Sequence, residues 1–160
     1  MEYTLAWERL DEKNGHDAGR ALLAQLYRAQ TGEALPDIAI TPLGKPYFEG
    51  SPWHFSISHT KKHVFCVLST QNIGLDAEEM GRRVSENLIS RYLSPKEQDR
   101  LGANPQDAAL RLWVLKEAEG KRTGKGIGDW MKSTDFDPNC DKIQKIDGCY
   151  VAVLEDSDVI

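Results

Sequence analysis

Asp76 and Glu78 stand two residues apart in the segment GLDAEE, residues 74–79. Because alternate residues of a β-strand point to one face, a strand here holds both carboxylates side by side, and Gly74 allows another backbone to approach closely. On a buried face two such carboxylates repel unless a cation or a shared proton neutralises them, and hard oxygen ligands of this kind suit Mg²⁺. The segment therefore indicates a divalent-metal site, and the alternative is an exposed strand end with solvated charges.

A second charged group lies in the segment WVLKEAEGKRTGKGIG, residues 113–128. Trp113, Glu117 and Lys121 are spaced four apart, so on a helix they share roughly one face. The preceding turns are apolar nearly all round, which indicates that the helix is buried where its charges begin. The alternative is a solvent-side ion pair between Glu117 and Lys121, worth roughly a few tenths of a kcal/mol.

Together the two segments predict one cage of oxygen ligands. Glu117 would bring a third carboxylate to Asp76 and Glu78. Lys116 or Lys121 would then meet an anionic ligand that the metal already holds. The combination predicts a site for an anion bound through Mg²⁺.

Two other patterns do not fit the sites that they suggest. In GKRTGKG, Gly120 and Gly124 are one residue too close for a P-loop, and Lys125 is followed by glycine where that loop has Ser or Thr. His59 and His63 are four apart, which suits zinc on a helix, whereas here they flank a predicted turn between strands. We expect His59 to serve instead as an anion donor at a strand end.

The composition is that of a globular protein of one ordinary domain. The chain has 160 residues, of which 40% are hydrophobic and 28% charged, and its formal net charge is -5. That charge argues against bulk nucleic-acid binding. No segment has the length and apolarity of a membrane span, and the amino terminus lacks the pattern of a signal peptide. We therefore expect a cytoplasmic protein that binds neither nucleic acid nor membrane.

The three cysteines, Cys66, Cys140 and Cys149, contain no CxxC pair. Their odd count encourages neither a disulfide framework nor a cysteine zinc site, so reduced thiols are expected. Cys66 lies inside the apolar run HVFCVL, where a core position is expected.

Hydrophobic periodicity and turn residues predict the elements that carry these side chains. In the first part of the chain we expect a strand, a helix ended by Gly32, a short strand followed by turns, and then three strands. Their ranges are 3–10, 17–31, 37–53, 54–60, 63–69 and 72–79.

Beyond Met80 the pattern changes to helices. Two short helices open with serine caps, and a long helix begins at Asn104 and ends at Gly124. Gly120 inside the long helix costs about 1 kcal/mol relative to alanine, and the sequence offers no reason for it. The ranges are 85–93, 94–102 and 104–126, followed by a hairpin at 141–155 that turns at Asp147 and Gly148.

Each half of the chain thus offers strands and a long helix, with no linker between the halves. We predict an α+β fold made of two similarly built, tightly joined α/β lobes, residues 1–70 and 71–160. Two lobes in one chain make a monomer the natural expectation.

Four stretches resemble the 4'-phosphopantetheinyl transferases, specifically the pseudo-dimeric Sfp-type branch of that superfamily. They occur in the family's order and are GKPYF at 44–48, FSISHT at 55–60, GLDAEE at 74–79 and WVLKEAEGKRTGKG at 113–126. The GxDxE and WxxKEAxxKxxGxG patterns are the specific ones. The helix HDAGRALLAQL also resembles the family's helix with a phosphate-binding arginine, here Arg20. The likeness implies lobes related by pseudo-twofold symmetry with a coenzyme A site between them.

The resemblance implies transfer of the phosphopantetheine arm of coenzyme A to a serine of an acyl or peptidyl carrier protein, with release of adenosine 3',5'-bisphosphate. Asp76, Glu78 and Glu117 would hold Mg²⁺, and Glu117 is also a candidate base for the serine. Attack on a diphosphate mainly requires charge neutralisation and alignment, which a metal and lysines supply. The implied catalytic residues are Glu117, Lys121 and Asp76, and the expected coenzyme A contacts are Arg20, Lys45, Pro46, Ser58, His59, Lys116 and Lys121.

Two departures from the family's pattern leave alternatives open. Ser56 stands where the family usually has Asn, and the part before the arginine helix is shorter, so fewer basic residues can hold the 3'-phosphate. The second hypothesis is a catalytically lapsed domain that binds coenzyme A or a nucleotide for regulation or interaction. The third is a plain α+β interaction domain with solvated charges.

The carrier proteins implied by the resemblance are commonly acidic. They would need a basic or apolar patch on this acidic chain. Arg82, Arg83 and Arg91 lie between the two specific motifs, and we expect the carrier contacts there.

Overall fold

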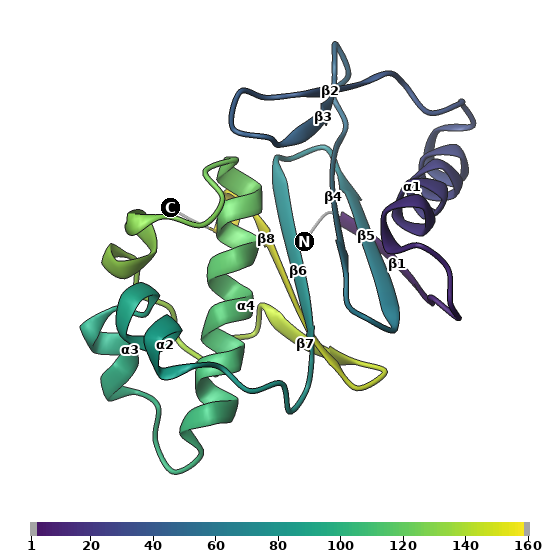
Figure 1. The fold of residues 1–160 in the computed structure, drawn as a ribbon. Helices are drawn as coiled ribbons and strands as arrows, with labels where there is room; N and C mark the ends of the chain where they lie inside the picture. Colours follow the sequence, from purple (N-terminus) through teal and green to yellow (C-terminus); the bar gives the residue numbers. More distant parts are fainter. Residues whose placement is uncertain (1–2, 159–160) are drawn as a thin grey trace.

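The computed structural model describes residues 3–158, which form two three-stranded sheets flanked by helices and one small two-stranded sheet (Figure 1). The predicted mixture of helices and strands is confirmed. The elements in chain order are β1 (Tyr3–Arg9), α1 (Gly15–Thr31), β2 (Ile38–Ile40), β3 (Pro46–Phe48), β4 (His54–His59), β5 (His63–Ser69), β6 (Ile73–Glu79), α2 (Glu86–Tyr92), α3 (Pro95–Asp99), α4 (Pro105–Thr123), the 3₁₀ helix η1 (Asp129–Ser133), β7 (Ile143–Ile146), β8 (Cys149–Glu155) and the 3₁₀ helix η2 (Asp156–Asp158).

The first sheet has the antiparallel order β1-β5-β4, and α1 packs on one of its faces. Helix α1 begins after Asn14, whose side chain accepts a hydrogen bond from the Asp17 amide, and it ends at Gly32 with φ 74°. Both ends therefore follow from local chemistry, a side-chain N-cap and a left-handed C-cap. Apolar residues of α1, such as Leu22 and Leu23, pack on Val64 and its neighbours in a first core.

The second sheet has the order β6-β8-β7 and carries α4 on one face. The hairpin β7–β8 turns at Asp147 and Gly148, which have φ values of 47° and 80° and give the predicted two-residue turn. In both sheets the first strand of the sheet pairs with its last strand, so the strand order is shared. No helix in the part of the chain that the structure describes is long and apolar enough to cross a membrane.

A third core joins the two sheets, so that α1 and α4 lie on opposite outer sides of the strands (Figure 1). Strands β5 and β8 are buried along their whole length because each has one face toward its own helix and the other toward the opposite sheet. Phe65 and Val67 of β5 meet Val151 and Val153 of β8 in this core. The lobes therefore share a continuous apolar interior.

The free edge of β6 is covered by hydroxyl groups of β4. Ser56 Oγ accepts a hydrogen bond of 3.0 Å from the Leu75 amide, and Ser58 Oγ accepts one of 3.2 Å from the Ala77 amide. The hydroxyls of Ser56 and Ser58 thus satisfy two backbone amides at the edge of β6, where a neighbouring strand would otherwise pair. These contacts fix the position of β6 relative to β4.

Gly74 brings α4 close to β6, as its place in GLDAEE predicts. A Cβ atom at Gly74 would lie 2.0 Å from the Ala118 carbonyl oxygen and 2.4 Å from the Arg122 amide nitrogen. These are backbone atoms of α4, which cannot turn aside as a side chain can. The missing side chain is therefore what lets the helix cross the strand at this distance.

Close packing also explains Gly120, for which the sequence gives no reason. A Cβ atom there would lie 2.8 Å from the carbonyl oxygen of Gly126 and 3.3 Å from the ring of Trp130. The Gly126 amide donates to the Gly120 carbonyl over 3.1 Å, so the loop after α4 folds back onto the helix. The helix η1 that follows was not predicted, because this return depends on contacts made in three dimensions.

The prediction that Lys116 contacts coenzyme A is wrong. Its side chain is completely buried, and its ammonium group lies 2.8 Å from Glu97 and donates to the carbonyl oxygens of Met131 and Thr134 over 2.5 and 2.6 Å. Burial lowers the pKa of Lys116, while the Glu97 carboxylate opposes that effect. Lys116 therefore ties α4 to α3 and η1 on the side of the helix away from Glu117.

Replacement of Lys116 by methionine should lower the free energy of unfolding by about 3 to 5 kcal/mol, because Glu97 would be left as a buried, uncompensated charge. The double variant Lys116→Met with Glu97→Gln should recover part of the loss. Urea unfolding monitored by circular dichroism measures both. A single variant within about 1 kcal/mol of the parent would contradict a structural role for this pair.

Gly74→Ala should destabilise the protein by about 1 to 3 kcal/mol or more through overpacking against the α4 backbone. Gly128→Ala is the matched control, since its Cβ atom would come no closer than 3.3 Å to a side-chain atom of Trp130. Thermal unfolding of both variants tests the close crossing. Equal melting temperatures would show that α4 can withdraw from β6 without cost.

Candidate active site

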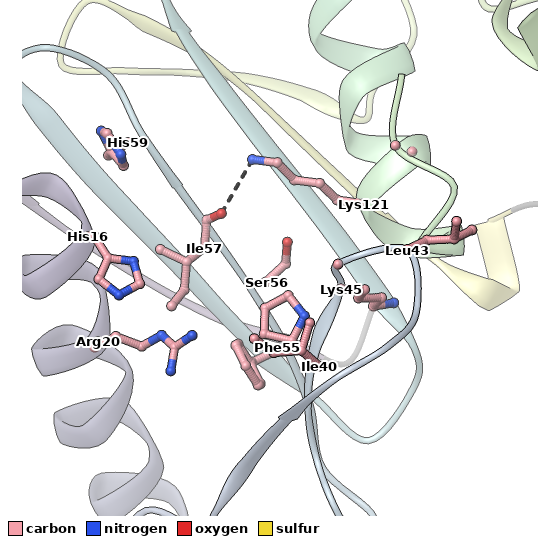
Figure 2. Close-up of a pocket in the computed structure, with 15 residues that line it drawn as sticks. His16, Arg20, Ile40, Leu43, Lys45, Phe55, Ser56, Ile57, His59 and Lys121 are labelled. Atoms are coloured by element: carbon pink, nitrogen blue, oxygen red, sulfur yellow. Dashed lines mark hydrogen bonds between the residues drawn. The ribbon is translucent and has the colours of Figure 1, made fainter. Parts of the chain in front are cut away.

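A pocket of about 460 Å³ lies between α1, the β2–β3 hairpin, β4 and the end of α4 (Figure 2). Both sheet layers contribute to it, because α1 and β4 belong to the first layer and α4 to the second. Its lining combines an apolar floor with several cationic side chains. The lining residues are His16, Arg20, Ile40, Leu43, Gly44, Lys45, Pro46, Phe55, Ser56, Ile57, His59, Gly120, Lys121, Gly124 and Gly126.

The Asp76 carboxylate is buried where β6, β4 and α4 meet. Its Oδ1 atom accepts a hydrogen bond of 3.2 Å from Ser58 Oγ and one of 3.3 Å from Lys121 Nζ. Its Oδ2 atom is buried and has no hydrogen-bond partner among the described residues. Burial raises the pKa of Asp76 to about 6, against the lowering effect of Lys121 and with a smaller raising effect of Glu78.

Lys121 joins the carboxylates to the pocket. Its ammonium group donates to Asp76 and, over 3.3 Å, to the carbonyl oxygen of Ile57 (Figure 2). It thereby bridges α4 to β6 and β4. The alternative prediction is an ion pair between Lys121 and Glu117 on the solvent side of the helix. Within residues 3–158, the ion pair of Lys121 is instead with Asp76.

Glu117 lies on the turn of α4 before Lys121 and is partly buried. Its pKa is raised to about 7, mainly by burial and also by the negative charges of Asp76 and Glu78, against the lowering effects of Lys121 and Arg82. Three carboxylates from a strand and a helix therefore act on one another electrostatically. This is the convergence that the spacing in the two motifs predicts.

As they stand, these carboxylates do not form a closed cage. Among residues 3–158, no three His, Cys, Asp or Glu side chains are close enough together to form a metal site. Cationic side chains hold two of the carboxylates instead, Lys121 at Asp76 and Arg82 at Glu78 over 3.3 and 2.5 Å. The sequence analysis did not anticipate the pair of Arg82 and Glu78, because i,i+4 spacing brings side chains together on a helix, whereas Glu78 lies in a strand and Arg82 in the segment that follows it.

The residues nevertheless suit a divalent cation. A buried carboxylate oxygen without a partner, Asp76 Oδ2, is an incomplete arrangement that a cation would complete. Burial, the main cause of the raised pKa values of Asp76 and Glu117, disfavours the charged carboxylates, and a bound cation would offset this effect. The donors are all carboxylate oxygens, which Mg²⁺ prefers.

An arginine and two histidines line the opposite wall of the pocket. Arg20 and His16 lie one turn apart on α1, and His59 stands at the end of β4, all around the pocket (Figure 2). The ring of His59 lies over the start of α1, since a Cβ atom at Gly15 would be 2.4 Å from its Nδ1 atom. The sequence analysis gave His16 no role, yet its position four residues before Arg20 places both on one face of the helix.

Lys45 and Pro46 lie at the β2–β3 end of the pocket. Lys45 Nζ donates to Asn72 Oδ1 over 2.6 Å and to the Arg122 carbonyl oxygen over 2.5 Å, and burial lowers its pKa. The lysine thus ties the hairpin to the end of α4. Its aliphatic stem also lies 3.4 Å from where a Cβ atom at Gly124 would be.

Ser58 does not line the pocket, contrary to its expected contact with coenzyme A. It is 5% exposed, and its hydroxyl accepts a hydrogen bond from the Ala77 amide and donates one to the Asp76 carboxylate. Because side chains alternate along a strand, Ser58 points toward β6, while His59 points toward the pocket. Ser58 therefore orients Asp76, and Ser56 is the serine in the pocket lining.

Comparisons with known proteins identify a family. A sequence profile of the 4'-phosphopantetheinyl transferase superfamily matches residues 72–150, which include β6, α4 and most of the second lobe. The chain is similar to the 4'-phosphopantetheinyl transferase Sfp of Bacillus subtilis strain 168, at 35% identity over 89 residues, 52% of this chain and 39% of that protein. It is also similar to a 4'-phosphopantetheinyl transferase of Bacillus pumilus, at 32% identity over 95 residues, 56% of this chain and 40% of that protein.

The matched part of this chain spans about two fifths of the length of either relative. The profile match contains the carboxylates of β6 and α4 that the structure brings together. On this agreement of sequence and geometry, residues 72–150 carry the features of the 4'-phosphopantetheinyl transferase superfamily, and the chain is similar to Sfp-type members of it.

Proposed function

We propose that this protein transfers the 4'-phosphopantetheine group from coenzyme A to a serine of an acyl or peptidyl carrier protein and releases adenosine 3',5'-bisphosphate. The observation that carries the proposal is the buried Asp76 carboxylate, paired with Lys121, at the side of a pocket that Arg20, Lys45 and Lys121 line. A diphosphate substrate needs both features. Cations hold its charge, and a nearby carboxylate can accept the proton of the attacking hydroxyl.

Asp76, Glu78 and Glu117 are the residues that would hold Mg²⁺. When bound, the ion would neutralise the diphosphate charge and orient the phosphate groups. The unpartnered Oδ2 atom of Asp76 supports this assignment. Ser58 would keep the Asp76 carboxylate oriented through its hydrogen bond to Oδ1.

Glu117 would accept the proton of the carrier serine. A general base works best when its pKa lies near the working pH, and that of Glu117 is raised to about 7. Lys121, whose ammonium group lies at the junction of the carboxylates and the pocket, would stabilise negative charge that develops on the phosphate.

The pocket residues would hold the nucleotide part of coenzyme A. Arg20 and His59 would bind the 3'-phosphate, with His16 as an additional donor beside them. Lys45 and Pro46 would border the adenine. The division of the chain at residue 70, with two lobes related by pseudo-twofold symmetry, is part of the same proposal and is supported by the shared strand order of the two sheets.

The proposed partner is an acidic carrier protein, the proposed location is the cytoplasm and the proposed state is a monomer. Arg82 and Arg83 follow β6 directly and are exposed, so an acidic surface docked there would lie next to Glu78 and its neighbours. Arg91 is placed over the ring of Tyr92, with 5.2 Å between its guanidinium carbon and the ring centre. Of the three arginines, Arg82 and Arg83 are therefore the residues nearer to the candidate site that we expect to contact the carrier protein.

Incubation with coenzyme A, Mg²⁺ and a panel of apo carrier proteins should add one phosphopantetheine arm to at least one carrier, as measured by mass spectrometry. Glu117→Gln should lower the transfer rate by about two orders of magnitude or more, because it removes a metal ligand and the base together. Glu86→Gln, at an exposed glutamate of α2, is the control and should keep full activity.

Two results of this experiment would count against the proposal. Unchanged turnover of Glu117→Gln would reject the role given to that residue. Tight binding of coenzyme A without transfer to any carrier would favour the catalytically lapsed binding domain.

A second prediction concerns the metal-free protein at different pH values. The pKa of Glu117 is about 7 in the folded protein and ordinarily 4.5, so the folded state holds more protons between these values. The free energy of unfolding should therefore fall as the pH rises through about 4.5 to 7. Asp76, with a pKa raised to about 6, should add to the same trend.

Glu117→Gln removes one of these ionisations, so above about pH 7 the metal-free variant should be more stable than the parent, by on the order of 2 kcal/mol. Denaturant unfolding in the presence of a chelator, from about pH 5 to pH 8, measures the difference, again with Glu86→Gln as the control. A variant that is no more stable than the parent at the alkaline end would contradict the raised pKa.

A further inference from the structure

Arg82 is the one residue outside the family motifs that holds a carboxylate of the candidate metal site. Its Nη1 atom lies 2.5 Å from Glu78 Oε1. Glu78 is 19% exposed at its side chain and Arg82 is 51% exposed, so the pair sits at the rim of the site. The charge of Arg82 also reaches Glu117, whose pKa it lowers.

The carboxylate cluster is therefore balanced by the chain's own cations. Lys121 Nζ lies 3.3 Å from Asp76 Oδ1 and Arg82 Nη1 lies 2.5 Å from Glu78 Oε1, so each carboxylate of this strand pair has a cation beside it. Removal of any one of these positive charges would leave adjacent carboxylates to repel each other in a partly buried place. The arrangement is stable without a metal for this reason.

A divalent cation that uses Glu78 must compete with one of these two cations. Lys121 has a second hydrogen bond, to the Ile57 carbonyl oxygen, and faces the pocket, where an anionic substrate gives it a further partner. Within the described residues, Arg82 makes one ion pair, the exposed one with Glu78. Exposed pairs are weak, so Arg82 is the cation that can be displaced at low cost.

We propose that Arg82 is a displaceable counter-ion of the metal site, which holds Glu78 in place until a divalent cation takes its position. This inference rests on the proposed function, since it uses the same three carboxylates. It assigns to Arg82 control over metal affinity. The side chain keeps the site neutral and ordered when empty, and it lowers the apparent affinity for the metal as any competitor does.

The proposal predicts that removal of the Arg82 charge tightens metal binding. Arg82→Gln should bind Mn²⁺, an oxygen-preferring substitute for Mg²⁺, about threefold to fivefold more tightly than the parent, which corresponds to the upper end of the strength of an exposed ion pair. The loss of free Mn²⁺ signal in electron paramagnetic resonance measures the affinity, and competition with Mg²⁺ gives the value for that ion. Arg82→Lys, which keeps the charge, should stay close to the parent.

Arg83→Gln is the matched control, because it removes the same charge one residue further along an exposed turn. It should leave the affinity for Mn²⁺ within about twofold of the parent value, since an exposed charge without a close partner has little effect on a neighbouring site. Glu78→Gln should bind the ion weakly. Circular dichroism of each variant establishes that it is folded before the titration.

The outcomes separate this inference from the proposed function. If the parent binds Mn²⁺ while Arg82→Gln binds it with equal or lower affinity, the counter-ion role is overturned and the metal site stands. If Arg82→Gln and Arg83→Gln tighten binding equally, the effect is that of net charge and the specific role of Arg82 is also overturned. If the folded parent binds no divalent ion in the presence of coenzyme A, the metal site of the proposed function fails and the inference fails with it.

Discussion

The structure depends on the burial of one carboxylate, that of Asp76, in the junction of two sheets and a helix. Such burial is costly unless the charge is compensated, and one of its two oxygens has no partner. The surrounding contacts serve to hold this group: Ser58 and Lys121 at the other oxygen, and Gly74 two residues earlier, which brings α4 close. A purely structural core would have no use for such a group, and this is why the arrangement indicates a ligand.

Helix α4 performs two tasks on its two sides. Glu117 and Lys121 face the carboxylates and the pocket, whereas Lys116, one residue before Glu117, is fully buried against Glu97. The internal ion pair fixes the helix against α3 and η1, and this fixed position determines where Glu117 stands. A buried pair with several hydrogen bonds is rigid, and rigidity of the support is what a metal or catalytic site requires.

Much of the fold could be predicted from local signals. Caps such as Asn14 and Asn104, the left-handed glycines Gly32 and Gly124, and the turn at Asp147 set the ends of elements by contacts within a few residues. The sequence also predicts that Glu117 approaches the carboxylates of β6, because periods of two on a strand and four on a helix determine which residues share a face.

The errors arose where the answer depends on distant parts of the chain. Lys116 and Glu117 are about 100° apart around a helix, and the sequence alone does not show which side faces a buried partner. The same is true of Ser58, whose neighbour His59 is the one that reaches the pocket. The return of the loop onto Gly120 joins residues that only the folded chain brings together, so the reason for that glycine was hidden.

The hydroxyl contacts of Ser56 and Ser58 along β6 have a mechanical consequence. The same strand β4 supplies the floor of the pocket through Ile57 and the support of Asp76 through Ser58. Any motion that slides the two layers past each other would thus change the shape of the pocket and the position of the Asp76 carboxylate together. A substitution in β4 that shifts the strand should therefore alter both the pocket and the acidic cluster.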